Sequence, residues 1–322
     1  MTQVAASPKA TRVITRSDGH KLAVDCIGAP KGLPVFLMHG TPGSRRGPRP
    51  RASVLYRLGI QLICYDRPGY GGSDRRAGRT VADAAGDVQA IAEALDLGTF
   101  AVVGRSGGAP HALACAAAAQ LSGWVSSVVA LVGLAPPDAP GLDWYDGMTY
   151  SNKTEMAQEG AAEITARLTS RTEQYSADPG LLLDRLRPEL TPPDLRIVDE
   201  VAIQRLLSES YAEALRQGAE GWIDDSLALR KRWDFELAKI KVPVLIWHGL
   251  DDVFSPVSHA RWLAHCIRDD REDAAVEVRL QSGAAHFDAV EVLPDILTWV
   301  KDRAERSEGL RVDGTHQPSF CP

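Results

Sequence analysis

The chain has 322 residues, of which 44% are hydrophobic and 24% are charged, and its formal net charge is −6 at pH 7. This composition is typical of a soluble globular protein with a sizeable core, and it excludes disordered and fibrous proteins. The acidic excess argues against nucleic acid as a partner, because affinity for phosphate backbones comes from clustered Lys and Arg. The N-terminus shows no secretory signal, and no apolar stretch reaches the roughly 20 residues of a membrane-spanning helix. We therefore expect a cytoplasmic protein without a membrane partner.

The cysteines are five in number and scattered, and none has the spacing of a metal-binding pair. An odd count without such spacing predicts reduced structural thiols rather than disulfides or a zinc site. We expect neither a metal nor an organic cofactor. The cysteines are Cys26, Cys64, Cys115, Cys266 and Cys321.

The first elements along the chain form a predicted hairpin. Residues 12–16 and 20–26 alternate between apolar and polar side chains, and Ser17-Asp18-Gly19 separates them. Period-two alternation on both sides of an Asp-Gly pair is typical of two antiparallel strands joined by a tight turn.

Six later segments are short apolar runs of the kind found in strands that are covered on both faces. Helical patterns lie between the runs, for example at 80–95, and a repeated β-α order with right-handed crossovers produces an open parallel sheet. The runs are 34–38, 60–65, 100–103, 128–132, 242–247 and 276–280. The sequence therefore predicts an α/β fold with a mostly parallel eight-stranded sheet and helices on both faces.

One interval, 137–240, has amphipathic helical pattern and no convincing strand, which predicts an inserted helical cap. Its expected helices are 155–172, 198–217 and 221–237, with breaks at Pro179, Pro188, Pro192 and Pro193. The expected organisation is a core of residues 11–136 and 241–306 that ends in a helix over about 289–306, a cap of residues 137–240, and a loose tail of residues 307–322.

The strongest chemical signal is Gly104-Arg105-Ser106-Gly107-Gly108, between an apolar run and an Ala-rich helix at 111–120. Glycines on both sides of a serine allow a sharp strand-to-helix turn that exposes its hydroxyl. We identify Ser106 as the candidate nucleophile. The alternative is a glycine-rich turn that serves only packing or phosphate contact.

A serine hydroxyl needs a base that is oriented by a third group. Of the eight histidines, His286 lies in a flexible loop between the last predicted strand and the last helix, and we choose it as the base. Two adjacent acids, Asp251 and Asp252, follow a buried strand, and we choose Asp252 as the acid. Its neighbour Asp251 and the more distant Asp138 remain alternatives.

A developing oxyanion requires backbone N–H donors. The amide of Gly107, directly after the nucleophile, is one candidate. The second is Thr41, in the Gly- and Pro-rich loop that follows the strand at 34–38. The alternative for this loop is an ordinary strand-terminating turn.

With these motifs the chain resembles the α/β-hydrolase superfamily over about residues 11–305. The family order of Ser, acid and His is met by Ser106, Asp252 and His286. The resemblance favours Asp252 over Asp251 and implies a cap after the sixth strand. The segments that carry it are His39-Gly40-Thr41-Pro42-Gly43, Tyr65-Asp66-Arg67-Pro68-Gly69-Tyr70-Gly71-Gly72-Ser73, Gly104-Arg105-Ser106-Gly107-Gly108, His248-Gly249-Leu250-Asp251-Asp252 and residues 283–287.

Within the superfamily, the loop at Thr41 is similar to that of prolyl iminopeptidases and small-molecule esterases. Those peptidases usually have another Gly in the loop and a Trp before the nucleophile, where this chain has Thr41 and Arg105. These departures argue against exopeptidase activity. Haloalkane dehalogenases and epoxide hydrolases have an aspartate in place of Ser106, which argues against both.

The sequence thus predicts a serine hydrolase without a cofactor that cleaves a small-molecule carboxylic ester or related acyl compound through an acyl-enzyme. The alternatives are a prolyl iminopeptidase-like peptidase, a thioesterase or lactonase, a non-hydrolytic member, and a ligand-binding member that has lost catalysis. A peptidase would need an acidic cluster to capture a free amino group, and Asp224-Asp225 could supply one or could be solvated.

Several other side chains have two possible roles. Asp66 and Arg67 could form a charged subsite, but we expect them to tie loops together. His111 is expected to be structural, with a role in the pocket as the alternative. Aromatic residues of the cap region could line an apolar pocket or pack the helical layer. They are Trp144, Tyr145, Tyr150, Trp222, Trp233 and Phe235.

Overall fold

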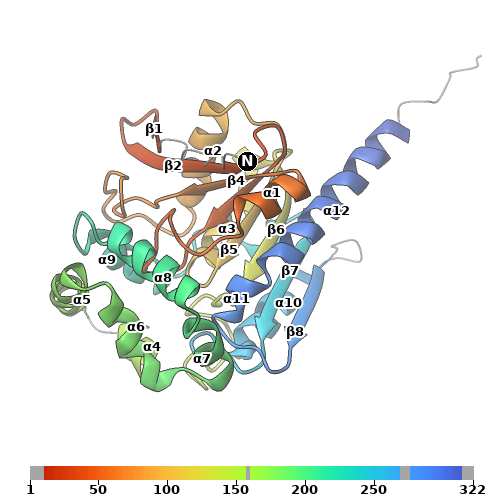
Figure 1. The fold of residues 1–322 in the computed structure, drawn as a ribbon. Coiled ribbons are helices and arrows are strands. Elements are labelled where there is room, and N and C mark those ends of the chain that lie inside the picture. The colour runs from red at the N-terminus through yellow and green to blue at the C-terminus, as the bar shows by residue number, and fades with distance from the viewer. Residues whose placement is uncertain (1–10, 157–159, 269–275, 314–322) are drawn as a thin grey trace, which may run out of the picture.

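A computed structural model of the chain describes residues 11–156, 160–268 and 276–313. Its centre is an eight-stranded sheet with the strand order β1-β2-β4-β3-β5-β6-β7-β8 (Figure 1). The strands are β1 (Arg12–Thr15), β2 (Lys21–Gly28), β3 (Leu33–Met38), β4 (Ile60–Tyr65), β5 (Phe100–Arg105), β6 (Val125–Leu131), β7 (Val244–Gly249) and β8 (Val276–Gln281). The predicted fold class, including the N-terminal hairpin, is confirmed.

The sheet is antiparallel only at its N-terminal side, where β1 pairs with β2 and β2 pairs with β4. All other neighbouring strands are parallel. Met38 of β3 pairs with Gly104 of β5, and Gly104 pairs with Ala130 of β6. Because parallel strands end at one edge of a sheet, the loops after β3, β5, β6, β7 and β8 converge there.

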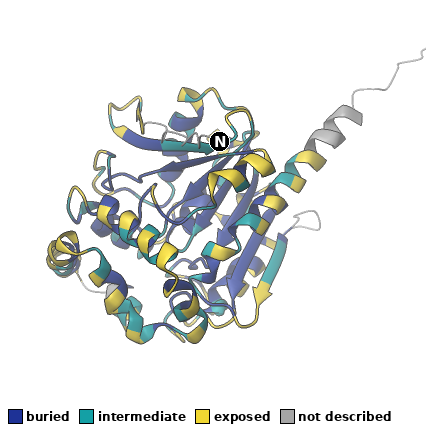
Figure 2. Cartoon of the chain, viewed as in Figure 1, coloured by how far each residue is buried: buried dark blue, intermediate teal, exposed yellow. Residues whose placement is uncertain are grey.

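Each face of the sheet is covered by its own hydrophobic core. Along β3, Phe36 and Met38 belong to one core, whereas Val35 and Leu37 belong to the other. The first core includes side chains of α2 (Ala84–Ala94), α3 (Gly108–Ala117) and α10 (Val257–Arg268), and the second those of α1 (Ala52–Leu58) and α12 (Leu293–Asp313). The inner strands β3, β4, β5, β6 and β7 are accordingly buried along most of their length (Figure 2), which explains why they appear as continuous apolar runs, whereas β1 and β8 at the two edges are largely exposed or half-buried.

Between β6 and β7 the chain forms a helical insertion with a third hydrophobic core, which Tyr70 of the sheet domain joins. Figure 1 shows its helices together beside the sheet. The described helices are α4 (Tyr150–Met156), α5 (Ala161–Ala177), α6 (Gly180–Leu186), α7 (Pro192–Val198), α8 (Val201–Ala214) and α9 (Glu220–Leu229). Short 3₁₀ turns occur at Ala119–Leu121, Arg187–Glu189 and Leu237–Lys239.

The predicted helices of the insertion are only partly right. The segment 155–172 contains the end of α4 and most of α5, and residues 157–159 lie outside the described part. The helix expected over 221–237 ends at Leu229, and α6 and α7 are absent from the prediction. Pro192 begins α7 instead of breaking a helix, because the first turn of a helix needs no N–H donor at that position.

The C-terminal segment begins with α11 (Asp288–Glu291), which is followed by α12. Helix α12 continues through residues 307–313, where the sequence predicts a loose tail, and its end projects beyond the sheet (Figure 1). The remainder of the predicted tail, with Cys321, lies outside the described residues. Among the described helices, none combines the length and the apolar character needed to span a membrane.

Candidate active site

Ser106 lies on the sharp turn between β5 and α3. Its φ is +53°, in the left-handed region that non-glycine residues rarely adopt. A Cβ atom at Gly108 would lie 2.5 Å from the carbonyl oxygens of His39 and Met38, and a Cβ at Gly104 would overlap the backbone of Gly108. The glycines of the motif are therefore required by close backbone packing, and the turn presents the Ser106 hydroxyl at the start of α3.

The structure brings Ser106, His286 and Asp252 into one chain of contacts. His286 Nε2 is 3.1 Å from Ser106 Oγ, and His286 Nδ1 is 2.9 Å from Asp252 Oδ2. The His286 loop follows β8, and the Asp252 loop follows β7. The three side chains, which are up to 180 residues apart in sequence, thus meet at the converging edge of the sheet.

The structure distinguishes between the carboxylates that the sequence leaves open. Asp252 is buried, and its Oδ1 accepts hydrogen bonds from the amides of Phe254 at 2.8 Å and Ser255 at 2.9 Å. Asp251 is exposed. Asp138 Oδ2 is 3.8 Å from Arg232 Nε, and Asp138 does not line the cavity that contains Ser106. Only Asp252 of the three contacts His286.

The electrostatics of this chain of contacts favour an ionised acid beside the imidazole. Burial acts to raise the pKa of Asp252, but His286 and His248 outweigh it and hold that pKa well below its ordinary value. Burial acts to lower the pKa of His286, but the carboxylate of Asp252 outweighs it and raises that pKa above its ordinary value. The arrangement can therefore accept a proton from Ser106 and stabilise the resulting imidazolium.

The two predicted oxyanion donors lie against each other. A Cβ atom at Gly107 would overlap Thr41 Oγ1, and both residues line the cavity beside Ser106. Neither the Thr41 amide nor the Gly107 amide donates a hydrogen bond to a described residue. Two such N–H groups next to a nucleophile can bind a developing oxyanion.

The family of the chain follows from its match to a family model. A family model described as alpha/beta hydrolase fold matches residues 34–288. The chain belongs to this family.

This alpha/beta hydrolase is similar to several characterised proteins. It is 28% identical over 251 residues to the non-heme chloroperoxidase of Streptomyces lividans, a match that covers 77% of this chain and 84% of the relative. Among solved structures, a thermophilic esterase from Thermogutta terrifontis matches with a TM-score of 0.65 and 20% identity, covering 92% of this chain and 98% of that one. The esterase EaEST from Exiguobacterium antarcticum matches with a TM-score of 0.63 and 22% identity, covering 93% and 100%. At these identities, the structural matches establish the shared fold.

A buried ion cluster lies behind the Thr41 loop of the alpha/beta hydrolase. Asp225 of α9 is 2.5 Å from the guanidiniums of both Arg67 and Arg79, and it accepts hydrogen bonds from Tyr70 at 3.0 Å and Thr41 Oγ1 at 2.7 Å. Burial acts to raise the pKa of Asp225, but the two arginines hold it well below its ordinary value. Helix α9 is thereby tied to the candidate oxyanion loop.

This cluster corrects the prediction for the acidic pair. Asp225 is fully buried against its two arginines, and Asp224 accepts hydrogen bonds from Arg75 at 2.9 and 3.0 Å. Neither carboxylate lines the cavity at Ser106. The pair is therefore neither a free amine-binding cluster nor a solvated one, because cations of the sheet domain already neutralise it.

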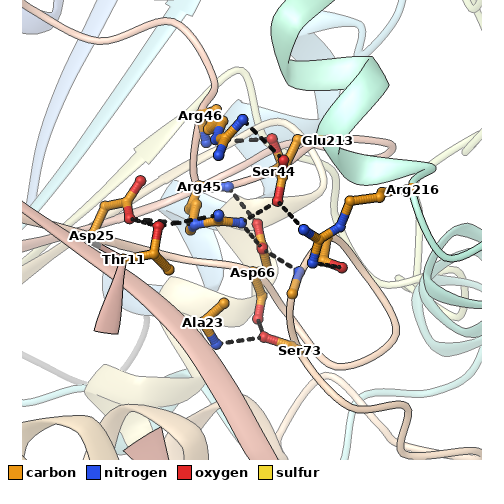
Figure 3. A network of polar contacts seen from close by, with 12 residues as sticks. Thr11, Ala23, Asp25, Ser44, Arg45, Arg46, Asp66, Ser73, Glu213 and Arg216 are labelled. Carbon is orange, nitrogen blue, oxygen red and sulfur yellow. Dashed lines mark hydrogen bonds and ion pairs between the residues drawn. The ribbon is translucent and has the colours of Figure 1, made fainter. Parts of the chain in front are cut away.

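The predicted structural roles of Asp66 and His111 are confirmed. Asp66 binds Arg45, which also contacts Asp25 and Glu213 of α8, so that a second buried network joins the insertion to the sheet domain (Figure 3). His111 Nδ1 is 2.8 Å from the carbonyl oxygen of Gly107, and the ring is buried. This contact between His111 and Gly107 stabilises the turn at Ser106.

The cavity beside Ser106 has a volume of about 140 Å³, and both the sheet domain and the insertion line it. Of the aromatic residues predicted for a pocket, only Trp222 lines this cavity. Trp144 packs on His259, and Trp233 stacks on Phe235 away from it. The other aromatic lining residues, which the sequence does not single out, are Tyr175, Tyr211, Phe254 and Phe287. Within the described residues, no cluster of three His, Cys, Asp or Glu side chains could hold a metal ion.

Proposed function

We propose that this protein is a serine hydrolase that cleaves a carboxylic ester or related acyl compound through an acyl-enzyme intermediate. The observation that carries the proposal is the continuous set of contacts from Ser106 Oγ through His286 to Asp252. The positive φ of Ser106 and the cavity beside its hydroxyl support the same role.

The proposed reaction has two halves. Ser106 Oγ attacks the carbonyl carbon of the substrate while His286 Nε2 accepts the hydroxyl proton, and the amides of Thr41 and Gly107 bind the oxyanion. Collapse of the tetrahedral intermediate breaks the bond to the alcohol, which leaves with the proton from His286. Water then attacks the acyl-enzyme with His286 again as base, and the acid and free Ser106 are released. Asp252 orients the imidazole and stabilises its charged form throughout.

The surroundings of Ser106 favour an ester substrate over a peptide with a free N-terminal amino group. An exopeptidase must hold the ammonium group of its substrate, yet none of the described residues that line the cavity is Asp or Glu. Asp224 and Asp225 are already neutralised by arginines. The esterases among the structural matches are consistent with this choice.

A fluorophosphonate probe tests the nucleophile directly, because it reacts with activated serines. We expect the probe to label Ser106, as located by mass spectrometry, and we expect no labelling of Ser106 in a His286→Ala protein. Ser106→Ala should lower turnover of the preferred p-nitrophenyl ester by about 10³-fold or more, while the exposed Ser122→Ala variant should behave as wild type. Hydrolysis by Ser106→Ala at the parental rate would refute the mechanism.

The preferred acyl group can be found with p-nitrophenyl esters of graded chain length, assayed beside aminoacyl amides. We expect esters to be cleaved and the amides to be poor substrates. Efficient cleavage of aminoacyl amides would favour the peptidase alternative.

A further inference from the structure

Arg105, the last residue of β5, directly precedes Ser106, and its side chain lines the same cavity. Its Nη1 atom is buried without a hydrogen-bond partner, and no described residue forms a hydrogen bond or ion pair with any part of its guanidinium. Burial lowers the pKa of Arg105, as expected for a cation that is held without a counter-charge. The reaction proposed above gives this cation no role.

Arg105 is partly buried, and a comparison with the fully buried arginines of the described chain shows how unusual its unpartnered guanidinium is. Arg45 contacts three carboxylates (Figure 3), and Arg67 and Arg79 share Asp225. Burying a charge without a partner carries a large desolvation penalty, which is why such groups are normally paired. Arg105 is therefore a cation whose counter-ion is not supplied by the described protein.

The surroundings of Arg105 offer a second donor. The Tyr211 hydroxyl of α8 has no partner among the described residues, and Tyr211 lines the cavity. Burial raises the pKa of Tyr211 to about 12, against the opposing effect of the Arg105 charge, so the hydroxyl stays protonated and can donate.

The charge of the cavity wall also favours an anionic ligand. Arg185, which is an exposed residue, also lines the cavity, and the described lining residues include no Asp or Glu. A wall of this kind attracts anions and repels cations.

We propose that Arg105 binds a carboxylate of the substrate, so that the enzyme acts on esters that also carry a free carboxylate group. The proposal rests on the serine hydrolase activity proposed above and names its substrate class. A guanidinium binds a carboxylate through two parallel N–H···O bonds, which fixes the orientation of the anion as well as its position. Because Arg105 is adjacent to Ser106 in the chain, holding the carboxylate also positions the ester at the nucleophile.

The test compares substrates that differ in one charge. Monomethyl esters of the dicarboxylic acids from succinate to pimelate place a carboxylate on the acyl portion, and O-acetylated hydroxy acids place it on the alcohol portion. Each is assayed beside its neutral analogue, in which an amide replaces the carboxylate. We expect the wild type to prefer the carboxylate in at least one series by about tenfold or more in kcat/KM, mainly through a lower KM.

Variants at position 105 separate binding from structural support. Arg105→Met should lower the ratio of kcat/KM for the carboxylate over the amide to near one, and Arg105→Lys should retain part of it. Arg205→Met is the matched control, because Arg205 lies on the exposed side of α8 and, within the part of the chain that the structure describes, pairs only with Glu209. This control should keep the full preference. A merely structural role would lower both rates and leave their ratio unchanged.

A binding measurement tests the role of Arg105 in the absence of turnover. In the Ser106→Ala protein, glutarate should bind more tightly than glutaramate by calorimetry, and the Ser106→Ala/Arg105→Met protein should lose this difference. The proposal is overturned if neither series nor glutarate shows a preference for the carboxylate, or if Arg105→Met retains it. Failure of the fluorophosphonate probe to label wild-type Ser106 would instead refute the serine hydrolase, whatever glutarate does.

Discussion

Replacing Asp225 by Asn tests whether the buried ion cluster stabilises the protein through its charge. Asn has nearly the same size as Asp and keeps one oxygen acceptor, so the main change is the loss of the negative charge. Arg67 and Arg79 are 1% and 2% exposed, and water cannot replace the lost carboxylate. Leaving a buried charge without its partner costs about 3–5 kcal/mol, and here two cations lose the same partner. We expect a loss of at least about 3 kcal/mol in the free energy of unfolding.

Urea unfolding at pH 7 measures this loss, and Asp224→Asn is the control. Asp224 pairs with Arg75, whose side chain is 45% exposed, and such a pair contributes about 1 kcal/mol or less. The pKa of Asp225 is depressed in the folded state, so its contribution is fully present above the ordinary Asp pKa of about 3.9 and is lost as pH falls below it. The gap between wild type and Asp225→Asn should therefore shrink in acid. Equal stabilities of the two variants at pH 7 would refute the reasoning.

Two further predictions concern catalysis. Because the pKa of His286 is raised above its ordinary 6.5 and the neutral imidazole is the base, kcat/KM should rise with pH through an inflection above 6.5. Asp252→Asn should move this inflection to lower pH and reduce kcat by about 10⁴-fold, whereas the exposed Asp251→Asn should change neither. An unchanged pH profile of Asp252→Asn would contradict the assigned contact. Gly107→Ala should lower kcat by about 10²–10³-fold with an unchanged circular dichroism spectrum, because its Cβ would displace Thr41 from the oxyanion site. Wild-type kcat in this variant would exclude that site.

The sheet and the residues around Ser106 could be predicted because they depend on local signals. Buried parallel strands appear as apolar runs, and a serine at a turn of positive φ needs glycines around it. His286 and Asp252 follow from their loops at the same sheet edge. The carboxylate choice needed the structure, since Asp251 and Asp252 differ in burial and contacts and not in residue type.

The insertion was predicted less well because its contacts are long-range. Arg67 and Asp225 are 158 residues apart, and no local pattern indicates that they pair. The prolines near α7 predict breaks, because a proline that begins a helix and a proline that ends one cannot be distinguished from the residue type alone. Arg105 was visible only as a departure from a family pattern, and its lack of a partner is a property of the folded chain.

The position of Asp225 on α9 limits how the insertion can move. Lifting α9 from the sheet domain would pull one carboxylate away from two guanidiniums in a medium of low dielectric constant, where their attraction is strongest. Such a motion would also release Thr41 Oγ1 from its acceptor. A movement of the insertion that keeps this ion cluster intact therefore has to leave α9 in place, and the Thr41 loop then stays in place with it.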